Sequence, residues 1–230
     1  MIRINKYLSE SGICSRRAAD KLIEEGIVTV NGVTADLGTR VSEADQVEVD
    51  GKVVKPVKKK IVLAYNKPTG IECTADRKNK DNIIDAVNYP ERVVNIGRLD
   101  KNSCGLILLT NDGELANIIM KAGDTHDKEY FVKVNGTVTD EFIKKMEAGV
   151  RLDDGVLTRS CKVFKQSDNS FNIILTQGLN RQIRRMCLAL GLRVVFLKRI
   201  RIMTIKLGNI KPGEYRILTD LEVKSLYDRA

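Results

Sequence analysis

Apolar and polar residues follow patterns along most of the chain that predict short strands separated by helices. Six segments have strand patterns, either as short apolar runs or as alternation at every second position. They span residues 61–65, 106–109, 129–135, 156–165, 171–176 and 193–207. Helical patterns at 114–121 and 139–149 interrupt them irregularly. This order predicts an α+β domain built on a mostly antiparallel, mixed β-sheet.

The first part of the chain has a different pattern, with two helices followed by small hairpins. Residues 4–11 predict a short helix, and Ser15 is a good N-cap residue for a second helix over 16–25. An Asn-Gly pair at 31–32 and an Asp-Gly pair at 50–51 each lie between valine-rich segments, which is a strong hairpin signal. These elements predict a small α+β unit that is separate from the larger one.

A basic segment that contains proline, residues 55–60, lies between the two patterned regions and predicts a linker. The expected organisation is therefore a small domain at 1–54, this linker, and a larger domain at 61–230. With 230 residues, of which 43% are hydrophobic, the chain can bury one full core and a small additional one.

The charge of the chain points to a polyanionic partner. It has 39 Lys and Arg residues against 30 Asp and Glu residues, a formal net charge of +9. Contacts of Lys and Arg with phosphates supply most of the nonspecific affinity for nucleic acids. No apolar run approaches the ~20 residues that a membrane span needs, and no signal-peptide core follows Met1. The sequence therefore predicts a nucleic-acid partner and no membrane partner.

Metal and cofactor chemistry find no support in the sequence. The five cysteines form no Cys-x-x-Cys pair and His126 is the only histidine, so no metal site is expected. No Gly-rich dinucleotide loop or phosphate loop is present, so no cofactor is expected either. Scattered thiols are typical of a reducing compartment, which predicts a cytoplasmic protein.

Asp100 is the first candidate for chemistry, because it stands on a loop between two glycines and just before an apolar strand. Gly97 and Gly105 permit a tight loop with unusual dihedral angles. The loop would place Arg98 and Asp100 at the edge of a rigid sheet, which is a common position for a catalytic group. The alternative interpretation is a turn in which the aspartate only satisfies local amides.

A second candidate segment begins at Gly178 and continues as a helix. Apolar residues recur at helical spacing from Ile183 onward and mark a buried stripe. At ~100° per residue, Arg184 falls at the edge of this stripe, whereas Arg181 and Arg185 fall on the far face.

An arginine at the edge of a buried stripe turns inward only where an anion meets it. Asp100 is the candidate anion for Arg184, and the pair would hold the carboxylate ionised and oriented. The alternative is a helix whose arginines face solvent and contact only phosphates, which we expect for Arg181 and Arg185. Together with Asn180, these two arginines are expected to contact a nucleic-acid substrate.

Both segments resemble the RsuA-like family of ribosomal RNA pseudouridine synthases, most strongly its RluF-like branch, which acts on 23S rRNA. The matching stretches are Gly97-Arg98-Leu99-Asp100, Ser103 to Leu106, Leu108 to Gly113 and Gly178 to Met186. The resemblance implies that Asp100 is the essential catalytic residue and that Arg184 is its partner.

The same resemblance assigns roles to two further residues. Tyr130, in Lys128-Glu129-Tyr130, matches the active-site tyrosine whose ring stacks on the target base, as suits a base flipped out of RNA. Leu197 matches an apolar residue that packs under the uracil. Arg98, next to the catalytic position, is expected to contact the substrate. Cys104 occupies a position that is often polar in the family.

The stretches Arg3 to Leu8, Ser15 to Ala19 and Val30 to Gly32 together resemble the alpha-L RNA-binding module, first described in a small-subunit ribosomal protein, and the resemblance covers residues 1 to about 54. The module recognises structured RNA through shape and phosphates. Basic side chains lie at the starts of its helices, where helix N-termini already attract phosphate. The expected RNA contacts are Arg3, Lys6, Arg16, Arg17 and Lys21. The alternative for these side chains is a solvated basic face.

The resemblance implies an isomerase that converts a specific uridine to pseudouridine in rRNA, most simply a stem-loop of 23S rRNA. It would act as a monomer without metal or cofactor. A carboxylate can act as a nucleophile in glycosidic chemistry, so Asp100 could attack the ribose or the uracil ring, or remove a ribose proton. The alternatives are a non-catalytic ribosome-associated factor, or a synthase that acts on 16S rRNA or tRNA.

Overall fold

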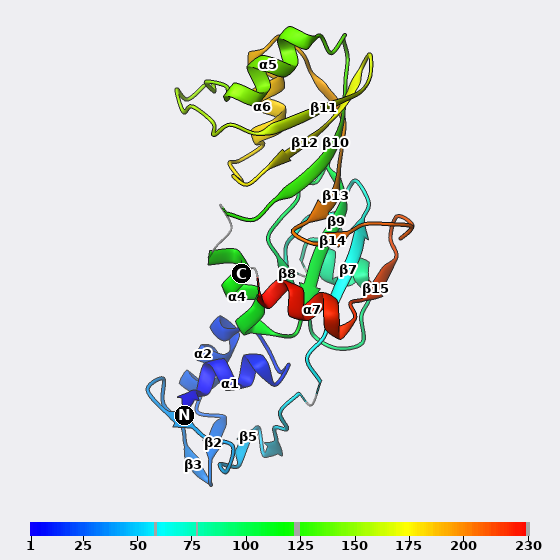
Figure 1. Ribbon diagram of the computed structural model, residues 1–230. Helices are drawn as coiled ribbons and strands as arrows, with labels where there is room; N and C mark the ends of the chain where they lie inside the picture. Colours follow the sequence, from blue (N-terminus) through cyan, green and yellow to red (C-terminus); the bar gives the residue numbers. More distant parts are fainter. Residues whose placement is uncertain (58, 77, 122–124, 229–230) are drawn as a thin grey trace. The chain divides into compact units, whose positions relative to one another are not determined.

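The computed structural model describes residues 1–57, 59–76, 78–121 and 125–228, and these form two compact units (Figure 1). The N-terminal unit comprises Met1–Ile61 with Tyr89–Val93 and Asn111–Gly113. The larger unit comprises Val62–Asn88, Val94–Thr110 and Glu114–Ala230. The predicted linker, 55–60, includes Lys58, which lies outside the described residues, and the predicted domain boundaries stay a prediction.

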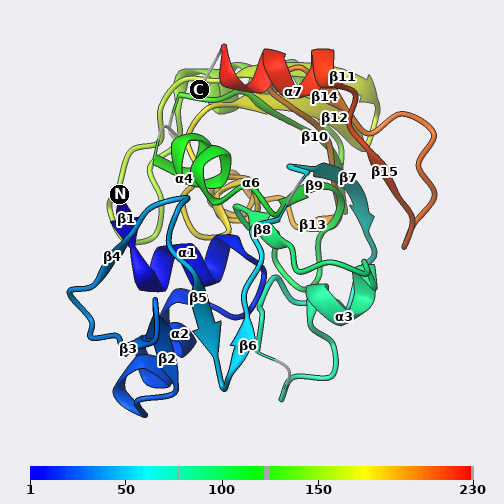
Figure 2. The same ribbon diagram turned by 90° about the horizontal axis from the view of Figure 1, so that it is seen from below.

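The N-terminal unit packs two helices against a small antiparallel sheet (Figure 2). Its elements are β1 (Ile2–Arg3), α1 (Ile4–Glu10), α2 (Arg16–Glu24), β2 (Val28–Val30), β3 (Val33–Thr34), β4 (Arg40–Val41), β5 (Val47–Val49) and β6 (Lys52–Val53). The sheet order is β3-β2-β5-β6, and β1 pairs with β4. The Ser15 hydroxyl accepts from the amide of Ala18 and caps α2, as predicted. Both predicted hairpins are confirmed, with Asn31 and Asp50 at positive φ.

The larger unit is built on one sheet whose main path, among the described residues, is β11-β12-β10-β13-β9-β7-β15. Its strands are β7 (Val62–Lys67), β8 (Val94–Ile96), β9 (Cys104–Thr110), β10 (Lys128–Val134), β11 (Lys162–Ser167), β12 (Ser170–Leu175), β13 (Val194–Ile202), β14 (Ile205–Lys206) and β15 (Tyr215–Ile217). Strand β14 pairs with β13, and β8 pairs with β9. The contact between β13 and β9 is parallel, and the other pairings of these strands are antiparallel. The prediction of a mixed, mostly antiparallel sheet is confirmed.

Helices cover both halves of this sheet and divide its core into two clusters (Figure 1). The helices are α3 (Ile83–Val87), α4 (Gly113–Lys121), α5 (Asp140–Ala148), α6 (Gln182–Ala189) and α7 (Asp220–Tyr227). Helices α5 and α6 pack on β10, β12 and β13 through residues such as Met146 and Met186. Helices α4 and α7 pack on β7 and β9 through Leu115 and Leu226. No helix of the described residues is long and apolar enough to cross a membrane.

Two strand predictions are wrong in part. The strand expected at 156–165 begins only at Lys162, because Thr158 instead bonds back to Val150 through its amide and hydroxyl. The strand expected at 193–207 is interrupted after Ile202, where Met203 adopts a positive φ of 49° and turns the chain into β14. The short helix α3 and the C-terminal helix α7 were not predicted.

Candidate active site

Asp100 lies on a loop between β8 and β9 that is held by hydrogen bonds within the loop and from the buried Lys67. Gly97 has a φ of +74°, and the amide of Ser103 donates to the carbonyl of Asp100 at 3.0 Å. Lys67, the last residue of β7, is fully buried. Its ammonium donates to the carbonyls of Pro68, Ile71 and Lys101 at 2.9, 2.7 and 3.5 Å. Burial lowers the pKa of Lys67 from its usual value.

Gly105 allows the loop to end directly against β13. Gly105 and Arg199 pair in the parallel bridge between β9 and β13. A Cβ atom on Gly105 would lie 2.3 Å from the carbonyl oxygen of Arg199, and its φ is +102°. Both the space and the dihedral angle therefore require glycine at this position.

Two guanidinium groups face the Asp100 carboxylate, whose side chain is 30% exposed. The Arg184 Nε and the Arg181 Nη1 each lie 3.9 Å from its Oδ2. Arg184 also donates to the carbonyl of Asn102 at 2.9 Å and to the Ser103 hydroxyl at 3.2 Å. Burial and the charge of Arg181 lower the pKa of Arg184, and Asp100 opposes this effect. Arg184 thus joins helix α6 to the loop that carries Asp100.

Arg181 and Arg185 also have partners within the chain, and their expected contacts with phosphates stay a prediction. Helix α6 begins at Gln182, so Arg181 is its N-cap residue, with a φ of 49°, and the helical count does not apply to it. Arg185 does lie on the helix, but its Nε donates to Asp153 at 2.6 Å and its Nη2 lies 2.7 Å from Asp154. Each of these arginines therefore faces a carboxylate of the chain itself.

A cavity of about 440 Å³ brings most of the predicted site residues together. Asp100, Arg98, Tyr130, Leu197 and Arg181 all line it. Tyr130 on β10 lies directly opposite residue 199 of β13, so these two side chains share a face of the sheet. Leu197 is two positions away from residue 199 on β13, so its side chain lies on the same face as that of Tyr130.

A second hollow of about 710 Å³ adjoins this cavity, since residues 98–100 and 178, 179 and 181 line both. Asn180 lines the second hollow but not the cavity. Arg185 lines neither of them.

Arg199 is a residue of the cavity that the sequence did not reveal. It is 4% exposed, and its Nε donates to the carbonyl of Leu106 at 2.7 Å. Its Nη1 lies 3.3 Å from the carbonyl of Arg98 and 3.5 Å from the Tyr130 hydroxyl. The guanidinium carbon lies 5.9 Å from the centroid of the Tyr130 ring, within range of a cation–π contact. The only sequence signal was the alternation of basic and apolar residues in β13.

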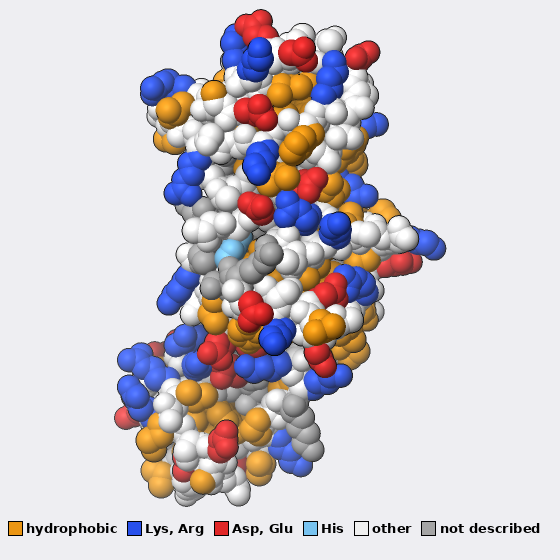
Figure 3. All heavy atoms as spheres, viewed as in Figure 1, with side chains coloured by type: hydrophobic (Ala, Val, Ile, Leu, Met, Phe, Trp, Pro, Cys, Tyr) orange, Lys and Arg blue, Asp and Glu red, His pale blue; other side chains and the backbone are white. Residues whose placement is uncertain are grey.

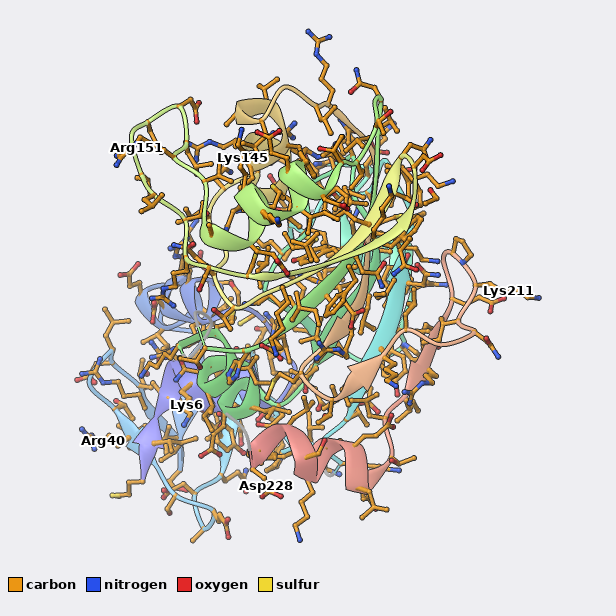
Figure 4. The ribbon with its side chains drawn as sticks, turned by 45° about the horizontal axis from the view of Figure 1, so that its top comes forward. Lys6, Arg40, Lys145, Arg151, Lys211 and Asp228 are labelled. Carbon is orange, nitrogen blue, oxygen red and sulfur yellow. The ribbon has the colours of Figure 1, made fainter. Side chains whose placement is uncertain are left out.

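The predicted RNA-binding side chains lie on α1, α2 and the segment before them. Arg3, Arg16, Arg17 and Lys21 are exposed, whereas Lys6 is half-buried and lies 3.6 Å from Glu10. Figure 3 shows Lys and Arg side chains gathered on the surface of the N-terminal unit, and Figure 4 labels Lys6 there. In the part of the chain that the structure describes, no group of three or more His, Cys, Asp or Glu side chains could hold a metal ion.

Comparisons with known proteins agree with both units. Residues 61–189 match the family model described as RNA pseudouridylate synthase, and residues 2–47 match the S4 domain model. The chain is 50% identical over 228 residues to the dual-specificity RNA pseudouridine synthase RluF of Escherichia coli K12, covering 98% of this chain and 78% of that protein.

Two further proteins extend this similarity. The chain is 39% identical to the ribosomal large subunit pseudouridine synthase B of Bacillus subtilis, covering 98% of this chain and 96% of that protein. A crystal structure of a pseudouridylate synthase superposes with a TM-score of 0.70 at 28% identity, covering 98% of this chain and all of the other.

Proposed function

The chain belongs to the RsuA-like family of RNA pseudouridine synthases, and from this premise we propose that Asp100 is the carboxylate with which it isomerises a uridine of ribosomal RNA. The reaction breaks the N-glycosidic bond, turns the uracil and rejoins it to the ribose through carbon. One observation carries the assignment: among the described residues that line the cavity, Asp100 is the only carboxylate. Hydrolytic glycosidases normally need two carboxylates and a water, so the cavity favours an isomerase.

The walls of the cavity supply the other requirements of the reaction. The Tyr130 ring stacks on the flipped uracil, and Leu197 packs under it. Apolar side chains around them exclude water, which keeps the detached uracil in place until it is rejoined. Asp100 acts by attack on the ribose or on the ring, or by removal of a ribose proton.

The arginines around Asp100 divide into two roles. Arg184 is a positioning residue, because it binds the loop at Asn102 and Ser103 and lies beside the carboxylate. Arg98 and Arg181 are more exposed and line both hollows, which suits contacts with the RNA backbone. Asn180, which lines the second hollow, is proposed to contact the RNA there.

The substrate that the chain fits best is a stem-loop of 23S rRNA, bound in part by the N-terminal module at 1–54. The Bacillus subtilis relative is named for the large ribosomal subunit, and the basic side chains of α1 and α2 suit phosphate contacts. The Escherichia coli relative is named a dual-specificity enzyme, so 16S rRNA and tRNA are the alternatives to test. The proposed enzyme is a cytoplasmic monomer that uses no metal or cofactor.

Tritium release from RNA labelled at uridine C5 tests the role of Asp100. Asp100→Asn should reduce turnover at least a hundredfold and leave RNA affinity and the melting temperature nearly unchanged. Asp168→Asn is a matched control, because that side chain is 93% exposed and lies outside the cavity. Turnover of Asp100→Asn above a hundredth of wild type would remove Asp100 from the mechanism.

A further inference from the structure

Four neighbouring strands of the large sheet, β11, β12, β10 and β13, have two different faces (Figure 1). Alternate side chains pack into the core under α5 and α6, among them Val132, Val163 and Leu197. The side chains between them point to the opposite face, which we call the outer face. They include Phe164, which is 49% exposed, and Phe196, which is 37% exposed. The outer face therefore presents large aromatic side chains to solvent.

Phenylalanines and lysines alternate on the outer face of β10 and β13. Lys133 comes two positions after Phe131 on β10, and Lys198 comes two positions after Phe196 on β13. The antiparallel register sets Phe131 opposite Lys198, and it sets Lys133 opposite Phe196. The Lys133 ammonium lies 5.9 Å from the centroid of the Phe131 ring, and the ring centroids of Phe131 and Phe196 lie 6.3 Å apart. Each ring on these two strands thus has a lysine beside it.

The same pattern reaches β11, the last strand at this end of the main path of the sheet. Phe131 lies opposite Asn172 of β12, and Asn172 lies opposite Phe164 of β11. The spacing of neighbouring strands therefore places Phe164 about 10 Å from Phe131. Lys162 comes two positions before Phe164 and is exposed. Aromatic rings with lysines near them thus lie on three of the four strands.

The charge of the outer face is positive. Lys133 and Lys162 are exposed and Lys198 is half-buried, and among the described residues none of the three forms an ion pair with a carboxylate. Glu129, which shares the face, is already paired with Arg201 at 2.9 Å. Lysines are depleted from the centres of protein interfaces, so their presence among the rings disfavours a protein partner such as a second copy of the chain. A polyanion that carries aromatic rings of its own fits both the charge and the phenylalanines.

We propose that the outer face of β11, β12, β10 and β13 is a further RNA-binding surface, which holds an unpaired segment of the RNA outside the stem-loop. Unpaired bases stack on the phenylalanine rings and the lysines contact the phosphates, which is how sheet surfaces with aromatic side chains bind single strands. Tyr130 and Leu197 line the cavity on the opposite face of the same strands, so this surface binds a part of the RNA away from the target uridine. It rests on the proposed function only for the identity of the RNA.

The affinity that an unpaired segment adds to a stem-loop tests the surface. Dissociation constants of the full chain are measured by fluorescence anisotropy for a 23S rRNA stem-loop, and for the same stem-loop with a twelve-nucleotide unpaired extension at either end. Wild type is compared with a double variant, Phe164→Ala with Phe196→Ala. Leu221→Ala is the matched control, because this apolar side chain is 81% exposed on α7. Melting temperatures report on folding.

Wild type should bind the extended RNA about twentyfold more tightly than the stem-loop, because two bases stack on the exposed rings. The double variant should lose this gain and still bind the stem-loop as wild type does, and Leu221→Ala should keep the gain. A gain that is absent from wild type, or equal in wild type and the double variant, would overturn the surface. A dimer of the chain that the two phenylalanine substitutions dissociate would also overturn it, in favour of a protein interface.

A second variant decides the question if the double variant fails to fold. Alanine at Lys133, Lys162 and Lys198 together should lower the slope of log affinity against log salt by about two units for the extended RNA, and leave the slope for the stem-loop unchanged. An equal slope in wild type and this variant for the extended RNA would refute the surface. A wild-type enzyme that gains affinity from the extension but forms no pseudouridine would instead contradict the proposed function and support the surface.

Discussion

Replacing Arg184 by lysine should lower turnover strongly, although the positive charge is kept. The Arg184 Nη2 donates to both the carbonyl of Asn102 and the hydroxyl of Ser103. Its Nη1 donates to the carbonyl of Val194 at 3.4 Å, and its Nε lies 3.9 Å from Asp100. The single nitrogen of lysine cannot replace all of these contacts at once. A hydrogen bond from a charged donor contributes about 1.5 kcal/mol or more, so the loss of two amounts to about 3 kcal/mol. If this 3 kcal/mol is lost from the stabilisation of the transition state, because the loop no longer holds Asp100 in place, kcat falls about a hundredfold.

Arg185→Lys is the matched control, one residue along the same helix. Arg185 pairs with Asp153 and Asp154, whose side chains are 78% and 52% exposed. Exposed ion pairs contribute about 1 kcal/mol at most, so the control should stay within about fivefold of wild type. Single-turnover kinetics separate kcat from RNA binding, and melting temperatures report on folding. Equal effects of the two substitutions, or a loss of Arg184→Lys confined to KM, would refute the positioning role.

Three further predictions concern binding and stability. Alanine at Arg16, Arg17 and Lys21 together should weaken RNA binding and reduce the slope of log affinity against log salt by about two to three units, and an unchanged slope would place the RNA contacts elsewhere. Gly105→Ala should destabilise the fold by about 3 kcal/mol, because its Cβ would meet a carbonyl of β13 at 2.3 Å, and an unchanged urea midpoint would contradict this. The arginine partner and capping bonds of Glu222 hold its pKa at about 2, against a usual 4.5. Glu222→Gln should therefore cost about 1 kcal/mol at neutral pH, and urea unfolding should show this deficit shrink as pH falls from 4.5 toward 2, where ionised Glu222 ceases to stabilise.

Local features of the fold were predictable because the residues that cause them lie close together in the sequence. The Asn-Gly and Asp-Gly hairpins, the cap at Ser15 and the loop that ends at Gly105 each depend on neighbouring residues. The strand expected at 156–165 failed because alternation cannot show that Thr158 bonds to Val150 in place of a neighbouring strand.

The environment of Arg199 could not be predicted, because it depends on contacts across about a hundred residues of chain. Its partners at Leu106 and Arg98 lie 93 and 101 residues away. Nothing in a single sequence says that a basic residue of β13 is buried against the Asp100 loop. The pairing of Arg185 with Asp153 could not be predicted for the same reason, because helical geometry gives the face on which a residue lies and not the residues that it meets.

Mapping of pseudouridines across the ribosomal RNA of a strain that lacks this gene tests the central claim most directly. The account predicts that one or a few pseudouridines disappear, that the wild-type gene restores them, and that the gene carrying Asp100→Asn, expressed at the same level, does not. Transfer RNA from the same cells shows whether a second substrate is modified. Unchanged rRNA in the deletion strain, or full restoration by Asp100→Asn, would contradict the account.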